Sequence, residues 1–134
     1  MARAPAVHVR IRVDFDTGAS LGPGKVALLE QIQACGSLSQ AARVLGLSYR
    51  RAWLLLDDIN QSFAEPAVVT ATGGPRGGGA ELTPFGQALI ERYRELEKVA
   101  EKQAARSLVR IAASATAQRA GLKRRLPGTK RARR

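Results

Sequence analysis

The sequence predicts a mainly helical protein with a small antiparallel β-sheet, built as a winged helix-turn-helix with a long carboxy-terminal helix. Two short helical patterns meet at a tight turn within residues 36–56. Two β-prone segments then flank a glycine-rich stretch, at residues 67–72 and 80–82. A long helical pattern begins at Thr83-Pro84. A helix-turn-helix followed by a hairpin and a further helix is the element order of this fold class.

The composition indicates one small domain without metal or disulfide chemistry. The chain has 134 residues, 45% of them hydrophobic, which is enough for a single core. Cys35 is the single cysteine and His8 the single histidine, so neither an intrachain disulfide nor a Cys/His zinc site can form. The sequence contains no membrane-length apolar run and no signal-peptide pattern, so we expect a cytoplasmic protein without membrane contact.

The charge is concentrated in one region of the sequence. The formal net charge is +11. Residues 1–101 hold eleven Lys or Arg and eleven Asp or Glu, whereas residues 102–134 hold the other eleven cations and no acid. A basic tail of this kind is common in proteins that bind nucleic acids. Because the body is neutral, DNA contacts by the body require a local cluster such as Arg43, Arg50 and Arg51.

The first expected elements are a strand and a helix. Residues 7–15 alternate apolar and polar side chains, which predicts a strand with one buried face. That face comprises Val7, Val9, Ile11, Val13 and Phe15. A helix is expected from about Lys25 to Cys35, with its apolar side, including Cys35, in the core. Gly36 is a natural end for this helix.

Two further helices form the helix-turn-helix. Ser37 can cap a helix over residues 38–45, which ends at Gly46. Gly46 can adopt a positive φ without steric cost, as the turn requires. Ser48 can cap the next helix, over about residues 49–63.

A β-hairpin follows the helix-turn-helix. The segments at residues 67–72 and 80–82 are its expected strands, and the glycine-rich residues 73–79 are its tip. The glycines set the register only loosely. Together with residues 7–15, this hairpin is expected to form a three-stranded sheet.

The last expected element is a helix over about residues 84–106, capped by Thr83 and with Pro84 at its first position. Its apolar stripe has spacings of three and four residues, which predicts pairing with another helix in a homodimer. The stripe comprises Phe85, Leu89, Tyr93, Leu96 and Ala100. We expect one domain over residues 1–106, and an Ala/Ser-rich extension with a disordered basic tail over residues 107–134.

Candidate DNA-binding residues gather at the start of the second motif helix. Arginine can bridge the two acceptors of guanine or bind a phosphate, and tyrosine can donate to a phosphate or stack. The alternative is a solvated helix face with an ordinary arginine pair. The candidates are Tyr49, Arg50, Arg51 and Trp53, of which Trp53 fits a core position equally well.

Two other places can contact DNA. Ser39 and Gln40 begin the first motif helix, where free backbone amides bind phosphate, although plain helix capping explains them equally well. Arg76 stands alone in the glycine-rich tip, where a wing residue can reach the minor groove or a phosphate. The alternative for Arg76 is a mobile loop.

No catalytic, nucleotide-binding or metal site is predicted. Gly73 and Gly78 have phosphate-loop spacing, but Gly79 and Ala80 stand where Lys and Ser or Thr are required. The neighbouring carboxylates of residues 57–58 point about 100° apart on a helix, so they do not form an acid/base pair. One His and one Cys cannot supply a nucleophile with its base. We therefore expect no enzyme activity, no cofactor and no metal.

Five short segments carry a family resemblance. They are Gly36-Ser37-Leu38-Ser39-Gln40-Ala41-Ala42, Gly46-Leu47-Ser48-Tyr49-Arg50-Arg51-Ala52-Trp53, Ala71-Thr72-Gly73-Gly74, Gly77-Gly78-Gly79-Ala80 and Leu82-Thr83-Pro84-Phe85-Gly86. Over about residues 20–105 the chain resembles the DNA-binding domain of the molybdate-responsive ModE-type regulators. Its helix-turn-helix is similar, more distantly, to that of LysR-type regulators.

The resemblance implies a homodimeric, cytoplasmic winged-helix regulator that reads a palindromic site in double-stranded DNA. It assigns DNA contacts to Ser48, Tyr49 and Arg50, and to Arg76 in the wing. Family members that sense molybdate carry a second, oxyanion-binding region after the long helix, where this sequence has only a basic tail. The sequence therefore gives no support for molybdate or another oxyanion as effector.

The expected function is sequence-specific, DNA-binding transcription regulation. Two alternatives stay open. The chain can be a non-specific, architectural DNA-binding protein driven by its basic tail, or a winged-helix module that binds other proteins.

Overall fold

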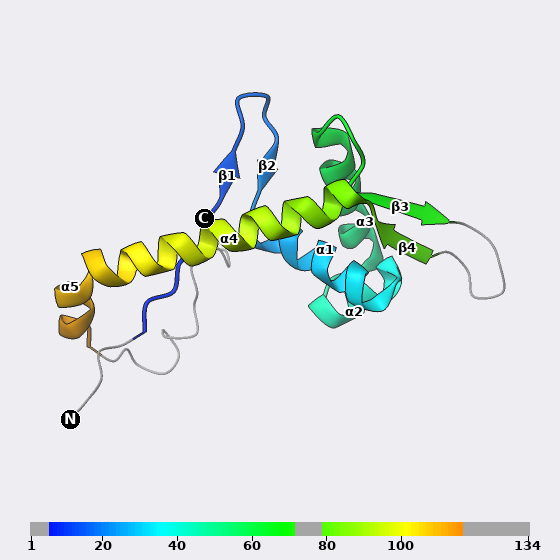
Figure 1. Cartoon of the computed structure of the whole chain (residues 1–134). Helices are drawn as coiled ribbons and strands as arrows, with labels where there is room; N and C mark the ends of the chain where they lie inside the picture. The colour runs from blue at the N-terminus through cyan, green and yellow to red at the C-terminus, as the bar shows by residue number, and fades with distance from the viewer. Residues whose placement is uncertain (1–5, 72–78, 117–134) are drawn as a thin grey trace, which may run out of the picture. The chain divides into compact units, whose positions relative to one another are not determined.

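The computed structural model describes residues 6–71 and 79–116 (Figure 1). Of these, residues 11–71 and 79–96 form one compact unit, and residues 6–10 with 97–116 form a second. The fold is mainly helical with small antiparallel sheets, so the predicted fold class is confirmed. Within the described residues, no helix is long and apolar enough to cross a membrane, and no cluster of His, Cys, Asp and Glu can hold a metal ion.

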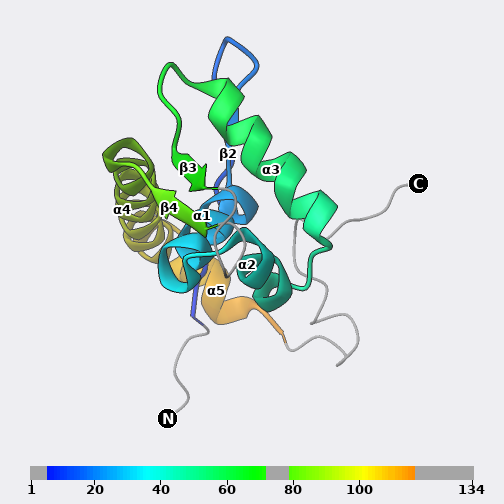
Figure 2. The ribbon, with the colours of Figure 1, turned by 90° about the vertical axis from the view of Figure 1, so that its right-hand side faces the viewer.

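Three helices build the core of the first unit (Figure 2). These are α1 (Pro23–Cys35), α2 (Leu38–Leu45) and α3 (Tyr49–Ser62). Their inward side chains are almost wholly buried and include Leu28, Leu29, Ile32, Ala41, Ala42, Ala52, Leu56 and Ile59. The small alanines let the helices approach closely, and the aliphatic residues supply the apolar area that stabilises the unit.

Local signals set both ends of α2 and the start of α3 where the sequence predicts them, whereas α1 begins two residues earlier than expected, at Pro23. Ser37 Oγ accepts a hydrogen bond from the amide of Gln40 at 3.2 Å, which caps α2. Ser48 Oγ accepts from the amide of Arg51 at 3.0 Å, which caps α3. Gly46 ends α2 at φ 70°, a left-handed conformation that favours glycine.

The strands form two separate antiparallel pairs, so the predicted three-stranded sheet is wrong. Strand β1 (Val13–Asp14) pairs with β2 (Ser20–Leu21), and β3 (Val68–Ala71) pairs with β4 (Gly79–Leu82). On the outer edge of β4, the amide of Ala80 donates to the carbonyl of Gly36 at 3.0 Å. This edge is therefore occupied by the turn between α1 and α2 rather than by a third strand.

Two burial predictions also need correction. The alternation of exposed and partly buried side chains in residues 7–15 holds as far as Val13. Phe15, however, is 42% exposed, and its ring meets the Phe63 ring edge-on with 5.7 Å between the ring centroids. Phe15 leaves the buried face because its amide and carbonyl close a tight turn with Ala19 and Gly18. Cys35 is only partly buried at the end of α1, so it is not a full core residue.

The long helix extends slightly further than predicted. It is α4 (Pro84–Ser107), and the short helix α5 (Val109–Ser114) follows it. The hydroxyl of Thr83 accepts from the amide of Gly86 at 3.0 Å, as the predicted cap requires. The division at residue 106 stays a prediction, and the basic tail over residues 117–134 lies outside the described residues.

Candidate nucleic-acid interface

The start of α3 presents its polar side chains to solvent. Tyr49 is 58% exposed, and Arg50 and Arg51 are exposed beside it. The opposite side of the helix, with Ala52 and Leu56, packs into the core. The burial of one side thus holds the first turn of α3 outward, where a groove of DNA can receive it.

The charge of this surface is locally positive. Arg43 on α2 and the arginine pair on α3 are all exposed, and no acid occurs from Ser37 to Leu56. Among the described residues, none of these three arginines forms an ion pair. Their guanidinium groups therefore remain available for phosphates or guanine edges.

The carboxylates that follow on α3 do not cancel this charge. Asp58 pairs with Lys25 Nζ at 2.5 Å, and the same ammonium group donates to Ser20. Lys25 is 12% exposed at its side chain, so this pair anchors α3 to α1. Asp58 is thus engaged in an ion pair, and the expectation that residues 57 and 58 form no catalytic pair stays a prediction.

The other α2 and α3 candidates are also on the surface. Ser39 and Gln40 are exposed at the start of α2, while Ser37 rather than either of them provides the capping oxygen. Trp53 is 47% exposed, so it is not a core residue. Ser48 is exposed, with its hydroxyl engaged as the α3 cap. DNA contact by these residues stays a prediction.

The β3–β4 hairpin is fixed to α3 by a residue that sequence reasoning missed. Asn60 Oδ1 accepts from the amides of Ala67 and Val68 at 2.8 and 3.2 Å, and its Nδ2 donates to the carbonyl of Val68 at 3.0 Å. The strands extend side by side beyond this point (Figure 1). Arg76, the predicted wing contact, lies in residues 72–78, outside the described residues.

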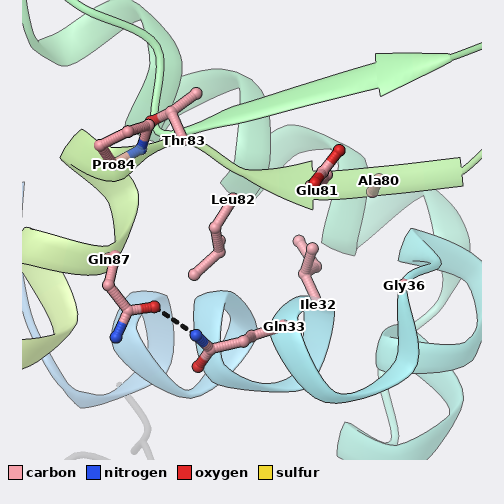
Figure 3. A pocket seen from close by; sticks show the side chains of 9 residues that line it. All are labelled: Ile32, Gln33, Gly36, Ala80, Glu81, Leu82, Thr83, Pro84 and Gln87. Carbon is pink, nitrogen blue, oxygen red and sulfur yellow. Dashed lines mark hydrogen bonds between the residues drawn. The ribbon is translucent and has the colours of Figure 1, made fainter.

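A shallow hollow of about 430 Å³ lies where β4 meets α1 and the start of α4 (Figure 3). The side-chain amide of Gln33 donates to the side-chain oxygen of Gln87 across it. Among the other lining residues, Glu81 is the one ionisable side chain, and Thr83 carries a hydroxyl that donates to the carbonyl of Pro66 at 2.7 Å. This lining offers no nucleophile and base pair, and the hollow is a junction between elements.

Most of the predicted dimer stripe on α4 packs within the chain itself. Tyr93 is 2% exposed, and its hydroxyl donates to the carbonyl of Ile11 at 2.6 Å. Phe85 and Leu89 pack, partly buried, against the same core. Tyr93 is therefore covered by the chain itself, while a dimer contact by the partly buried Phe85 and Leu89 stays a prediction. Leu96 is 44% exposed and Ala100 half-buried, and both stay predicted dimer contacts.

The fold and this surface define a winged helix-turn-helix protein with an unpaired arginine cluster on its second motif helix. No family model matches the chain. It is similar, however, to the molybdenum transport protein ModE of Azotobacter vinelandii, with 42% identity over 88 residues, which are 66% of this chain and 33% of the relative. The molybdenum-pterin-binding protein MopB of Rhodobacter capsulatus is 49% identical over 60% of this chain and 30% of its own length.

A third relative is named as a regulator. The DNA-binding transcriptional dual regulator ModE of Escherichia coli K12 is 42% identical over 60% of this chain and 30% of its own length. The resemblance to ModE-type regulators is thus confirmed over this part of the chain, which spans about a third of the length of these relatives. Among solved structures, full-length CbnR with its target DNA is similar over 63% of this chain and 27% of that one, with 20% identity and a TM-score of 0.48.

Proposed function

We propose that this chain is a sequence-specific DNA-binding transcriptional regulator whose helix α3 enters the major groove. The observation that carries the proposal is the exposed first turn of α3, where Tyr49, Arg50 and Arg51 lie on a capped and firmly packed helix. Arg50 and Arg51 read guanine edges, and Tyr49 binds a phosphate. Relatives of this part of the chain bear the names of transcriptional regulators, which supports the same function.

The surrounding elements position α3 on the duplex. Ser39 and Gln40 at the start of α2 approach the phosphate backbone, with Arg43 beside them. The β3–β4 hairpin acts as a wing, which brings Arg76 to the minor groove or a phosphate. Ser48 holds the start of α3, and Trp53 lines the groove side one turn further along.

We further propose a cytoplasmic homodimer that reads two half-sites. Two copies of α3 that occupy successive major-groove turns would lie about 34 Å apart, as a palindromic site requires. Leu96 and Ala100 on α4 are the contacts that remain accessible for such a dimer. We propose no enzyme activity for this chain.

A non-specific, architectural role is the second candidate, because the whole net charge of +11 lies within residues 102–134. Selection of bound duplexes from a random-sequence pool by the full chain separates the two functions. The proposed function predicts an enriched, palindromic sequence. Enrichment of no sequence, with tight binding to every duplex, would overturn it in favour of charge-driven binding.

A further inference from the structure

Exposed apolar side chains lie among the arginines of the helix-turn-helix. On α3, Leu54 is 46% exposed and Trp53 is 47% exposed, and Val44 on α2 is 61% exposed. Scattered exposed apolar residues are ordinary on protein surfaces. These three, however, lie on the same two helices as Arg43, Arg50 and Arg51. The surface therefore combines positive charge with apolar area.

Leu54 occupies the outer side of α3. The residues of α3 that are buried include Ala52, Leu56 and Ile59, and Leu54 lies about half a turn away from them around the helix. It follows Arg50 by four residues, so the two side chains share one face. A groove that receives this face of α3 therefore meets both Arg50 and Leu54.

The chemistry of the major groove offers one apolar feature for such a residue. Thymine presents a C5-methyl group there, whereas the other base edges present hydrogen-bond donors and acceptors. Leucine has neither a donor nor an acceptor, so it can gain only from the methyl group. The neighbouring arginines favour a polyanion over an apolar protein segment as the occupant of this surface.

We propose that Leu54 is a specificity-determining residue that contacts the methyl group of a thymine in the bound site, an inference that rests on the proposed function. Four residues along a helix cover about 6 Å. This distance is less than two base-pair steps of about 3.4 Å each. The thymine therefore lies within two base pairs of the guanine that Arg50 reads.

Uracil substitution tests this contact, because deoxyuridine pairs like thymidine but lacks the methyl group. Each thymine of the selected duplex is replaced singly by deoxyuridine, and the Kd of the full chain is measured by fluorescence anisotropy. For the wild-type chain, the Kd is expected to rise about fourfold when one particular thymine is replaced, which is the value of one buried methyl group. The Leu54→Ala variant is expected to bind thymine and uracil duplexes equally at that position.

A matched control shows whether the effect belongs to Leu54 or to the loss of any surface leucine. Leu108 is also a surface leucine, 40% exposed, and lies between α4 and α5. The Leu108→Ala variant is expected to keep the wild-type preference for thymine. Because Leu54 is half-exposed and alanine favours helices, Leu54→Ala is expected to fold, which its unfolding midpoint checks.

Two outcomes would overturn the inference. One is a selected sequence in which no thymine responds to uracil substitution. The other is a Leu54→Ala variant that keeps the wild-type response at every thymine. Leu54 would then be a contact for a protein partner and not for a thymine methyl group. Failure of the proposed function gives a different result: the selection from the random-sequence pool then enriches no sequence, before any uracil substitution is made.

Discussion

The side chain of Asn60 makes three hydrogen bonds with the backbone of Ala67 and Val68. Its oxygen accepts from both amides, at 2.8 and 3.2 Å, while its nitrogen donates to the carbonyl of Val68 at 3.0 Å. Asn60 lies near the end of α3, and Val68 begins β3. One amide group therefore fixes the wing strand to the helix that carries the candidate DNA-reading residues.

The Asn60→Ala variant is expected to lose about 1–3 kcal/mol in the free energy of unfolding, because two backbone amides and a carbonyl lose their partner in a half-buried place. Urea unfolding at neutral pH measures this loss. Gln61→Ala is the matched control, since Gln61 is the exposed neighbour, and it is expected to change stability by less than about 0.5 kcal/mol. Equal effects of the two variants would show that the Asn60 hydrogen bonds do not hold the wing.

Gly86 allows a close approach between α4 and the backbone of Ala67, the residue before β3. A Cβ atom at this position would collide with the carbonyl oxygen of Ala67 and lie 3.0 Å from the carbonyl carbon. The obstacle is backbone that cannot rotate away, so Gly86→Ala is expected to cost about 1–3 kcal/mol of stability. Gly24 in α1 has open space around its Cβ position. Gly24→Ala is expected to be neutral or to stabilise by up to about 1 kcal/mol, and thermal unfolding of both variants checks the contrast.

The Glu30–Arg94 pair joins α1 to α4 and should make stability depend on pH. Arg94 Nε and Nη2 donate to the two Glu30 oxygens at 2.8 and 2.6 Å, and these hydrogen bonds hold the pKa of Glu30 below its usual range against the opposing effect of burial. A lowered pKa in the folded state gives stability that is present above the unfolded pKa and lost as pH falls through the folded value.

The variant that tests this pair is Glu30→Gln. Both side chains are more than a third exposed, at 34% and 38%, so solvent screening limits the loss at pH 7 to about 1 kcal/mol or less. The difference between wild type and variant is expected to shrink as pH falls below about 4. A difference in unfolding free energy that stays constant or grows in acid would contradict the pairing.

Leu96 is the residue of the stripe to mutate, because its side chain is 44% exposed. Phe85, Leu89 and Tyr93 are partly or fully buried in the chain itself, so their substitution would also disturb the core. Sedimentation velocity is expected to show a dimer for the wild type and a shift to monomer for Leu96→Asp. Lys98→Asp also places an aspartate on an exposed position of α4, outside the stripe and with a larger change of charge, and is expected to stay dimeric. A Leu96→Asp variant that dimerises like the wild type would exclude this contact.

The helix-turn-helix could be predicted from the sequence because its boundaries are set locally. Ser37, Gly46 and Ser48 act within one turn of their own positions, and the structure places the helix ends there. The three-stranded sheet could not be excluded in this way. The hydrogen bond from Ala80 to Gly36 occupies the edge of β4, and it joins residues far apart in the sequence.

The difference between local signals and contacts distant in sequence also explains why the burial of Tyr93 in the α4 stripe and the role of Asn60 were not predicted. Periodicity shows that Tyr93 lies on an apolar face, but it does not show whether the chain or a partner covers that face. Asn60 is polar and near a helix end, so it resembles a solvated residue. Its position next to Ile59 and four residues after Leu56 places it toward the buried side, which was the available signal.

The specificity ratio of Arg50→Ala shows whether the first turn of α3 reads DNA sequence. This ratio is the Kd for a scrambled duplex divided by the Kd for the selected duplex. Arg92→Ala is the control, because it removes the same charge from an exposed position of α4. Arg50→Ala is expected to lower the ratio about 5- to 150-fold, the value of one lost bidentate base contact, while Arg92→Ala is expected to leave it unchanged. Equal ratios for the wild type and both variants would show that Arg50 does not read the DNA sequence.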